Sequence, residues 1–316
     1  MFENEEAIKE IRVQTNQAFI SRHQSQVTVA NEDHFLSAGD EAALVLYFSV
    51  KMAEFCDKFS PPMPKYVKGT AMHYFKRFYL HNSVMDHHPK EILVTAVYLA
   101  CKVEEFNVSM QQFVGNVQGN QERATRIILN NELLLMQELQ FHLTIHNPFR
   151  PVEGLIIDIK TRCESVHNAD SFRPNIDNFI DSVFLTDACL IFAPSQIALA
   201  AIIHAASKMK QNVDSYVTEQ LFDGQGNEAI TYIITCVRNI RLMVKNIPEL
   251  PGPAQVKALC VRLELCRNQD NNPDSSAYKR KLEELVDEED LLQQDTVPHK
   301  QARLGQSSTD IRAFSP

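Results

Sequence analysis

His142 and His146 are four positions apart, a spacing that could place two imidazoles on one helical face and so bind a metal ion. Thr144 and Ile145 between them are more typical of the end of a helix than of its interior. The seven cysteines are widely spaced without a CxxC pair, which is typical of neither a zinc ribbon nor a disulfide framework. We therefore expect no metal site, no cofactor and a reducing compartment.

The residue sets that mark common enzymes are absent from the sequence. Gly224-Gln225-Gly226 predicts a turn, and no GKS or GxxG follows it to hold a phosphate. There is no HExxH or GxSxG motif, and no DFG and HRD pair of a protein kinase. We therefore expect a protein that is not itself catalytic.

A lysine and a glutamate stand in otherwise apolar helical patterns. The stretch ILVTAVYLACKVEEF, residues 92–106, begins with ten uncharged residues and then reaches Lys102. Glu132 lies in another expected helix, where it shares one face with Ile128, Leu135 and Leu139. Two interpretations are open: a salt bridge within one domain, with Lys102 at a favourable helix C-terminus, or a pair that holds the backbone of a partner.

The length and composition of the chain limit the fold classes that could position these residues. The 316 residues predict roughly two domains of ordinary size. A composition of 44% hydrophobic residues with only nine glycines and no tryptophan argues against a loop-rich β architecture, so we expect an all-α fold. The formal net charge of -9 argues against broad binding to a nucleic-acid backbone and favours a protein partner.

Apolar residues recur at helical spacing through most of the chain. One series of helices is expected at about 40–59, 64–81, 89–105, 109–116 and 121–141, and a second at about 151–165, 174–191, 194–209, 213–222 and 227–246. Two further amphipathic helices are expected outside these series, at about 4–20 and 253–268. In the N-terminal helix, Ile8, Ile11 and Phe19 share one face and should dock on the series or on a partner.

The two series look like a duplication. Four residues of the first recur in the second at an offset of 105: Pro89, Ile92, Ala96 and Ala100 return as Pro194, Ile197, Ala201 and Ala205. The small residues predict that the third helix of each series is central and buried. At matching positions the second series has Ser207 in place of Lys102 and, at an offset of 106, Arg238 in place of Glu132. The charged pair is therefore not required by the fold, which favours the partner-binding interpretation.

Targeting and membrane segments are not expected. Residues 188–207 form a run of twenty residues without a charged side chain, the length of a membrane span. Pro194 within it is typical of the first turn of a new helix, so we expect no membrane contact. The acidic start MFENEEAIKEIR lacks the apolar core of a secretory signal, so we expect no export.

Several stretches together resemble the cyclin family, namely LACKVEEFNVS, QFVGN and LTDACLIFAPSQIAL. The resemblance implies two tandem five-helix cyclin boxes with additional N- and C-terminal helices. It divides the chain into 1–36 (N-terminal helix and lead-in), 37–146 (first cyclin box), 147–248 (second cyclin box), 249–269 (C-terminal helix) and 270–316 (an acidic, largely disordered tail). The MRAIL-type motif that forms a substrate-docking patch in cell-cycle cyclins is missing around 43–47.

By resemblance, such a chain is the regulatory subunit of the CDK-activating kinase, which joins transcription factor IIH together with a RING-finger assembly factor. Its kinase phosphorylates other cyclin-dependent kinases and the C-terminal domain of RNA polymerase II, so a nuclear location is implied. The resemblance assigns Lys102 and Glu132 to contacts with the kinase main chain. Glu105 and Phe106 border the same contact.

Two alternatives are open at this point. One is a cyclin of a Mediator-type kinase, whose boxes also resemble KVEEF. The other is a cyclin-fold transcription adaptor similar to transcription factor IIB. Lys65, Lys68, Lys76 and Arg77 lie on one expected helix and could touch phosphates. A solvated face is the favoured interpretation, because acidic residues outnumber basic ones, and no direct contact with nucleic acid is expected.

Overall fold

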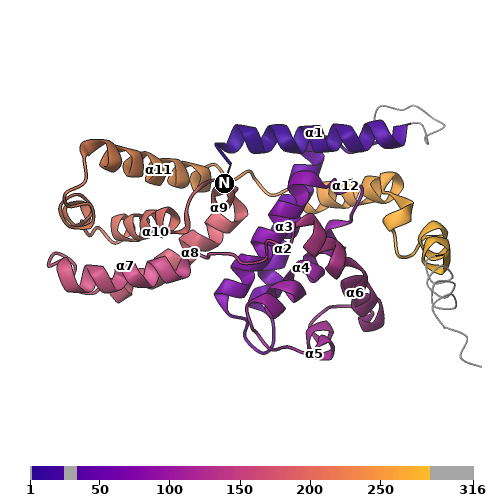
Figure 1. The fold of residues 1–316 in the computed structure, drawn as a ribbon, viewed down its shortest axis with the longest axis horizontal. Coiled ribbons are helices and arrows are strands. Elements are labelled where there is room, and N and C mark those ends of the chain that lie inside the picture. Colours follow the sequence, from indigo (N-terminus) through magenta and orange to yellow (C-terminus); the bar gives the residue numbers. More distant parts are fainter. Residues whose placement is uncertain (1, 25–33, 285–316) are drawn as a thin grey trace, which may run out of the picture. The chain divides into compact units, whose positions relative to one another are not determined.

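The computed structural model describes residues 2–24 and 34–284, and all regular structure among them is helical (Figure 1). This confirms the all-α prediction. The described residues fall into two units, with the division between Asn268 and Gln269. In the second unit, the described residues contain a short 3₁₀ turn, Gln269–Asn271, and a helix from 276 to 284. Most of the tail expected at 270–316 lies outside the described residues.

The first repeat consists of five helices close to the predicted ranges: α2 (Ala38–Asp57), α3 (Lys65–His81), α4 (Pro89–Val103), α5 (Met110–Gly115) and α6 (Gln121–Glu138). Local chemistry explains where they begin. Ser37 and Asp40 form a capping box at the start of α2, and Ser109 and Gln112 form another at α5. Pro89 occupies the first turn of α4, where a missing amide proton costs nothing.

The second repeat follows the same order with α7 (Phe149–Arg162), α8 (Arg173–Leu185), α10 (Pro194–Lys208), the π-helical η3 (Tyr216–Leu221) and α11 (Asn227–Lys245). Two short additional elements flank α8: η2 (Ala169–Phe172) precedes it and α9 (Ala188–Ile191) follows it. The prediction of one helix over 174–191 is wrong. Thr186 is extended, with φ −98° and ψ 172°, and its hydroxyl accepts a hydrogen bond from the Ala188 amide at 3.2 Å, so the chain turns there.

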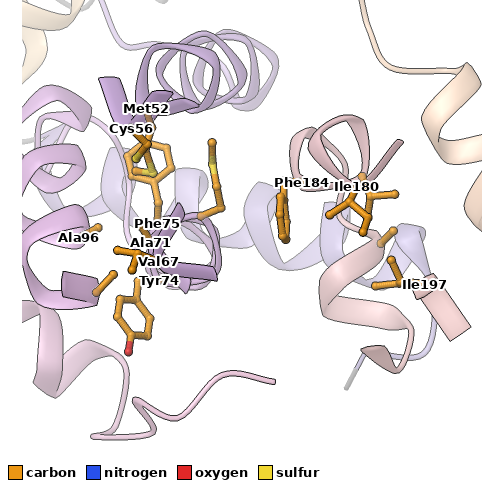
Figure 2. Packing of buried hydrophobic residues seen from close by; sticks show 14 of the residues in the cluster. Met52, Cys56, Val67, Ala71, Tyr74, Phe75, Ala96, Ile180, Phe184 and Ile197 are labelled. Carbon is orange, nitrogen blue, oxygen red and sulfur yellow. The ribbon is translucent and has the colours of Figure 1, made fainter. Parts of the chain in front are cut away.

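The Ala-rich third helix of each repeat is its central helix, as predicted. In the first repeat α4 packs against α2, α3 and α6, and in the second α10 packs against α7, α8 and α11. Ala96, Ala100, Ala201 and Ala205 are fully buried, because small side chains allow the neighbouring helices to approach closely. Figure 2 shows the core side chains of α2, α3 and α4 in the first repeat and those of α8 and α10 in the second.

The two repeats meet at Gly69 in α3. A Cβ there would collide with the amide of Asn147, in the linker before α7, and would lie 2.7 Å from Cζ of Phe184 in α8. The Asn147 amide group donates to the Tyr66 carbonyl at 3.1 Å and to the Thr70 hydroxyl at 2.9 Å. Only glycine permits this approach, so the linker is held against α3.

Two terminal helices complete the first unit: α1 (Glu5–His23) and α12 (Pro253–Cys266). α1 begins at Asn4, whose side chain accepts from the Ala7 amide, and it packs on α2 and α3. α12 packs on α2, and Arg262 in it donates to the Phe35 carbonyl at 3.0 Å. After α12, the buried Arg267 contacts the Glu91 carboxylate at 3.3 Å.

Candidate functional site

Lys102 lies in the last turn of α4, where the helix ends in a left-handed turn. Glu105 has φ 56°, and the Phe106 amide donates to the Cys101 carbonyl at 2.9 Å while the Glu105 amide donates to the Lys102 carbonyl at 3.3 Å. This pair of hydrogen bonds is a Schellman motif, here without the usual glycine. The motif fixes the backbone at Lys102 and directs the following chain away from the helix axis.

The Lys102 ammonium forms a salt bridge with Glu132 in the middle of α6. Its Nζ lies 2.6 Å from Oε1 and 2.9 Å from Oε2, and 4.9 Å from the centre of the Tyr98 ring. The Lys102 side chain is 48% exposed, whereas that of Glu132 is 14% exposed because Ile128, Leu135 and Leu139 beside it are buried. A pair whose lysine is half exposed to solvent stabilises a fold by only about 1 kcal/mol or less. Its two members nevertheless hold each other at the surface in a defined geometry.

Glu105 and Phe106 are placed differently from the pair. The Glu105 side chain is exposed in the turn. The Phe106 ring is half-buried and meets Phe59 edge-on, with 6.3 Å between ring centres. The structure therefore brings Lys102 and Glu132 into direct contact and leaves the Glu105 side chain exposed to solvent. The Phe106 ring instead packs against Phe59 within the first repeat.

Three exposed apolar side chains on or just after α6 were missed by the sequence reasoning. Leu129 and Leu133 are 57% and 55% exposed, and Phe141, three residues beyond the end of α6, is 60% exposed. A signal was available, because RIILNNELLLM is apolar over more than the one face that a buried helix needs. Together with the ion pair they give α6 a mixed apolar and charged outer surface, the composition of a protein-binding face.

The three N-terminal residues singled out in the sequence lie against the repeats. Ile8 and Phe19 are fully buried, and Ile11 is half-buried. Ile8 packs with Leu80 and Leu190, one from each repeat, while Phe19 belongs to the main core. The helix α1 is thus fixed on both repeats through its apolar face.

A charged contact reinforces this attachment. Arg12 donates two hydrogen bonds to Asp187, at 2.7 and 2.8 Å, and Lys76 of α3 lies 3.6 Å from the same carboxylate. Burial alone would raise the pKa of Asp187, but Lys76 and Arg12 hold it well below its ordinary value. Burial in turn lowers the pKa of Lys76.

The basic residues of α3 do not form a phosphate-binding stripe, and the interpretation as a solvated face is wrong for Lys68 and Lys76, which are buried, whereas Lys65 is 54% exposed. Each has an internal partner instead. Lys65 pairs with Asp177 at 2.5 Å, and the buried Lys68 pairs with Asp57 at 2.9 Å and Asp181 at 2.8 Å. Arg77 donates to the carbonyls of His142 and Leu139, at 2.7 and 3.0 Å. These cations join helices of one molecule, so they do not support an adaptor that binds nucleic acid.

Among the residues that the structure describes, no group of three His, Cys, Asp or Glu side chains is arranged to hold a metal ion. No helix within 2–24 or 34–284 combines the length and the apolar character needed to cross a membrane. The uncharged run 188–207 is divided between α9 and α10.

The counterparts of Lys102 and Glu132 in the second repeat do not form such a pair. Ser207 in α10 holds the same position as Lys102 does in α4, and Arg238 in α11 the same position as Glu132 in α6, counted from the first residue of each helix. The helices at these positions form without the salt bridge.

Comparison with known families and proteins gives consistent results. Residues 52–144 match the family described as Cyclin, N-terminal domain, and residues 147–245 match Cyclin C-terminal domain. Cyclin-H of Xenopus laevis is 44% identical over 274 residues, which cover 85% of this chain and 84% of that protein.

Two solved structures share the fold. One is the CAK complex of Chaetomium thermophilum bound to ATP-gamma-S, with a TM-score of 0.75 and 24% identity over 96% of this chain and 94% of the other. The second is the yeast TFIIK (Kin28/Ccl1/Tfb3) complex, with a TM-score of 0.61 and 25% identity over 77% of this chain and 96% of the other.

Proposed function

The chain belongs to the cyclin-H family of cyclins, and from this we infer that it is the non-catalytic regulatory subunit of a CDK-activating kinase, which binds and activates a cyclin-dependent kinase. We propose that the kinase binds the first repeat at the end of α4 and the outer face of α6. One observation carries this placement: the exposed Lys102–Glu132 pair occurs in the first repeat and is replaced by Ser207 and Arg238 in the second.

The chemistry of this face suits a partner's main chain. A lysine offers three donors and a glutamate four acceptor positions, so each can keep its salt bridge and still bond a peptide carbonyl or amide. The exposed Leu129 and Leu133 beside them supply the apolar contact area that a stable interface needs. Glu105 lies at the edge of the same face, while Phe106 supports the turn that carries it.

Activation follows from selective binding. A protein kinase is competent when the lysine of its strand β3 meets the glutamate of its αC helix, and the position of αC controls that ion pair. A rigid helical surface that binds αC only in the inward position shifts the kinase population toward the active form by its differential affinity. This chain needs no catalytic residue of its own for that role.

The wider assignment rests on the relatives. We place the chain in a complex with the kinase and a RING-finger assembly factor, and through them with core transcription factor IIH. In that setting its kinase acts on other cyclin-dependent kinases and on the C-terminal domain of RNA polymerase II. Such roles require a nuclear location.

Substitution of the pair tests the placement. Lys102→Ala and Glu132→Ala should weaken kinase binding by roughly thirtyfold or more, since hot-spot losses are commonly about 2 kcal/mol. The melting temperature should change little, because the Lys102 ammonium is half exposed and solvent weakens its pairing energy. Lys51→Ala is the control for Lys102→Ala, because Lys51 is 43% exposed and also forms a salt bridge, to Glu54 at 2.9 Å in α2. Normal kinase binding together with a steep fall in melting temperature would assign the pair to folding instead.

A further inference from the structure

The helix α12 is apolar on two opposite faces. One face packs on the rest of the molecule and is buried: Val256, Leu259, Leu263 and Cys266. The other is exposed and carries Ala254, Ala258, Val261 and Leu265. At about 100° per residue, these four side chains lie within about 60° of one another, opposite the buried set. Val261 is 56% exposed and Leu265 is 69% exposed, the largest fraction among the large apolar side chains that the structure describes.

The exposed apolar side chains of α12 have the spacing of a coiled-coil seam. Successive members are four, three and four positions apart, which is the alternation of a and d positions in a heptad. A helix that already packs through one face is ordinarily polar on the other, so burial on the repeats does not explain this second apolar stripe. Two helices that meet along such a stripe bury each other's a and d side chains, so the partner that this face fits is another helix.

The order of side chains along the stripe fits a second copy of α12 that runs in the opposite direction. In an antiparallel pair centred between Ala258 and Val261, Leu265 faces the partner's Ala254 and Val261 faces the partner's Ala258. Every layer then combines a large side chain with a small one, which allows close packing. A parallel pair in register would instead place alanine on alanine and leave those layers poorly filled.

Charged side chains beside the stripe favour the same arrangement. Lys257 and Glu264 flank it on one side, at equivalent positions of successive heptads. In the antiparallel pair, each Lys257 lies beside the partner's Glu264, whereas a parallel pair would bring it beside the partner's Arg262, a like charge. Glu264 is 54% exposed, and its contacts within the chain, with His88 and Arg267, are both 3.5 Å long. Its carboxylate is therefore accessible to a second chain.

We propose that the chain forms a homodimer through antiparallel contact between two copies of α12. The contact is two-fold and uses the same surface on both chains, so it closes with two copies. It uses neither α4 nor α6, where the kinase is proposed to bind, since α12 packs on α2. The dimer therefore goes beyond the proposed function and brings two kinase complexes together. Because a helix of 14 residues provides only a small interface, the dimer should dissociate on dilution.

Complementary charge reversal tests this contact. In sedimentation equilibrium, the mass of the unmodified chain should rise from 36.0 kDa toward twice that value as the protein concentration increases. Lys257→Glu or Glu264→Lys alone turns both attractive pairs into repulsive ones and should raise the dimer dissociation constant roughly tenfold or more. An equimolar mixture of the two variants restores both pairs, so it should dimerise as the unmodified chain does. A variant that had merely lost its fold would not be rescued in this way.

An apolar substitution gives a second measurement. Leu265→Asp should prevent dimerisation, because it places a charge in the seam. Ile157→Asp on α7 is the matched control, since this side chain is 60% exposed and lies outside α12, and it should leave the dissociation constant unchanged.

Four results would overturn the proposal: a single-chain mass at every concentration, a mass beyond two chains, single reversals without effect, or a mixture of the two reversed chains that stays monomeric. None of them depends on kinase binding, so they are separate from a failure of the proposed function.

Discussion

Arg12 and Asp187 are 175 residues apart in sequence, yet the Arg12 guanidinium donates two hydrogen bonds, of 2.7 and 2.8 Å, to the Asp187 carboxylate. The contact joins the N-terminal helix to the second repeat, and Lys76 links the same carboxylate to the first. One side chain therefore positions three parts of the molecule.

Replacing Asp187 should lower the free energy of unfolding more than replacing Arg12. Asp187→Asn leaves the buried Lys76 ammonium without its charge partner, and breaking a buried pair in this way costs about 3 to 5 kcal/mol in the free energy of unfolding. Arg12→Ala should cost less, because Lys76 still neutralises the carboxylate. Urea unfolding measures both, with the exposed Lys9→Ala in the same helix as control. Equal losses for Asp187→Asn and Lys9→Ala would show that the contact does not stabilise the fold.

Gly69→Ala should destabilise the chain, although alanine is normally favoured over glycine within a helix by about 1 kcal/mol. The new methyl group would collide with Asn147 and Phe184 and force the repeats apart. Gly154→Ala in α7 is the matched control, since nothing lies within 4 Å of its added Cβ, and it should raise stability by about 0.5 to 1 kcal/mol. Thermal melting of both variants checks the prediction, and a shift of the same sign in both would contradict it.

Glu41 should make stability depend on pH near neutrality. Burial raises its pKa from 4.5 to about 7, partly opposed by a hydrogen bond from the Ser83 hydroxyl. The folded state therefore binds a proton that the unfolded state releases, and stability falls as pH rises from about 4.5 to about 7. Glu41→Gln should remove this fall and raise the melting temperature more at pH 8 than at pH 5. A benefit that is the same at both values would show that the carboxyl is ionised throughout.

Shortening the chain at either side of α12 should give opposite results. A chain ending after residue 270 keeps Arg262 and Arg267 with their contacts, so its melting temperature and kinase activation should stay near those of the full chain. A chain ending after residue 252 uncovers the apolar residues that α12 packs against and should lose several kcal/mol of stability. A large fall in melting temperature for the longer chain would show that residues beyond 270 stabilise the repeats.

Periodicity and duplication predicted most of this fold, because both are local properties of the sequence. Helix starts at Ser109 and Pro89 follow from capping chemistry within one turn, and the burial of Ala96 and Ala201 follows from the repeated pattern. The break at Thr186 was missed, because the apolar pattern on either side of it continues in helical register. A side-chain hydrogen bond, rather than hydrophobicity, ends that helix.

Less of the candidate site than of the fold could be predicted from sequence periodicity and duplication. Sequence placed Lys102 and Glu132 on two helices, and the structure adds that they are in contact. The basic residues of α3 could not be assigned from sequence, because the partners of Lys65 and Lys68 include Asp177 and Asp181 in the other repeat. The spacing of the lysines along α3 does not indicate which carboxylates, more than 100 residues later in the sequence, will pair with them.

The contact at Gly69 makes the stability of the first repeat depend on residues that follow it in the chain. A first repeat separated before Asn147 would lose the Asn147 amide that bonds Thr70 and the Phe184 ring that covers Gly69. It would also leave the buried Lys68 without Asp181. Each half therefore supplies groups that complete the packing and charge pairing of the other, and we expect the two repeats to unfold together rather than one at a time.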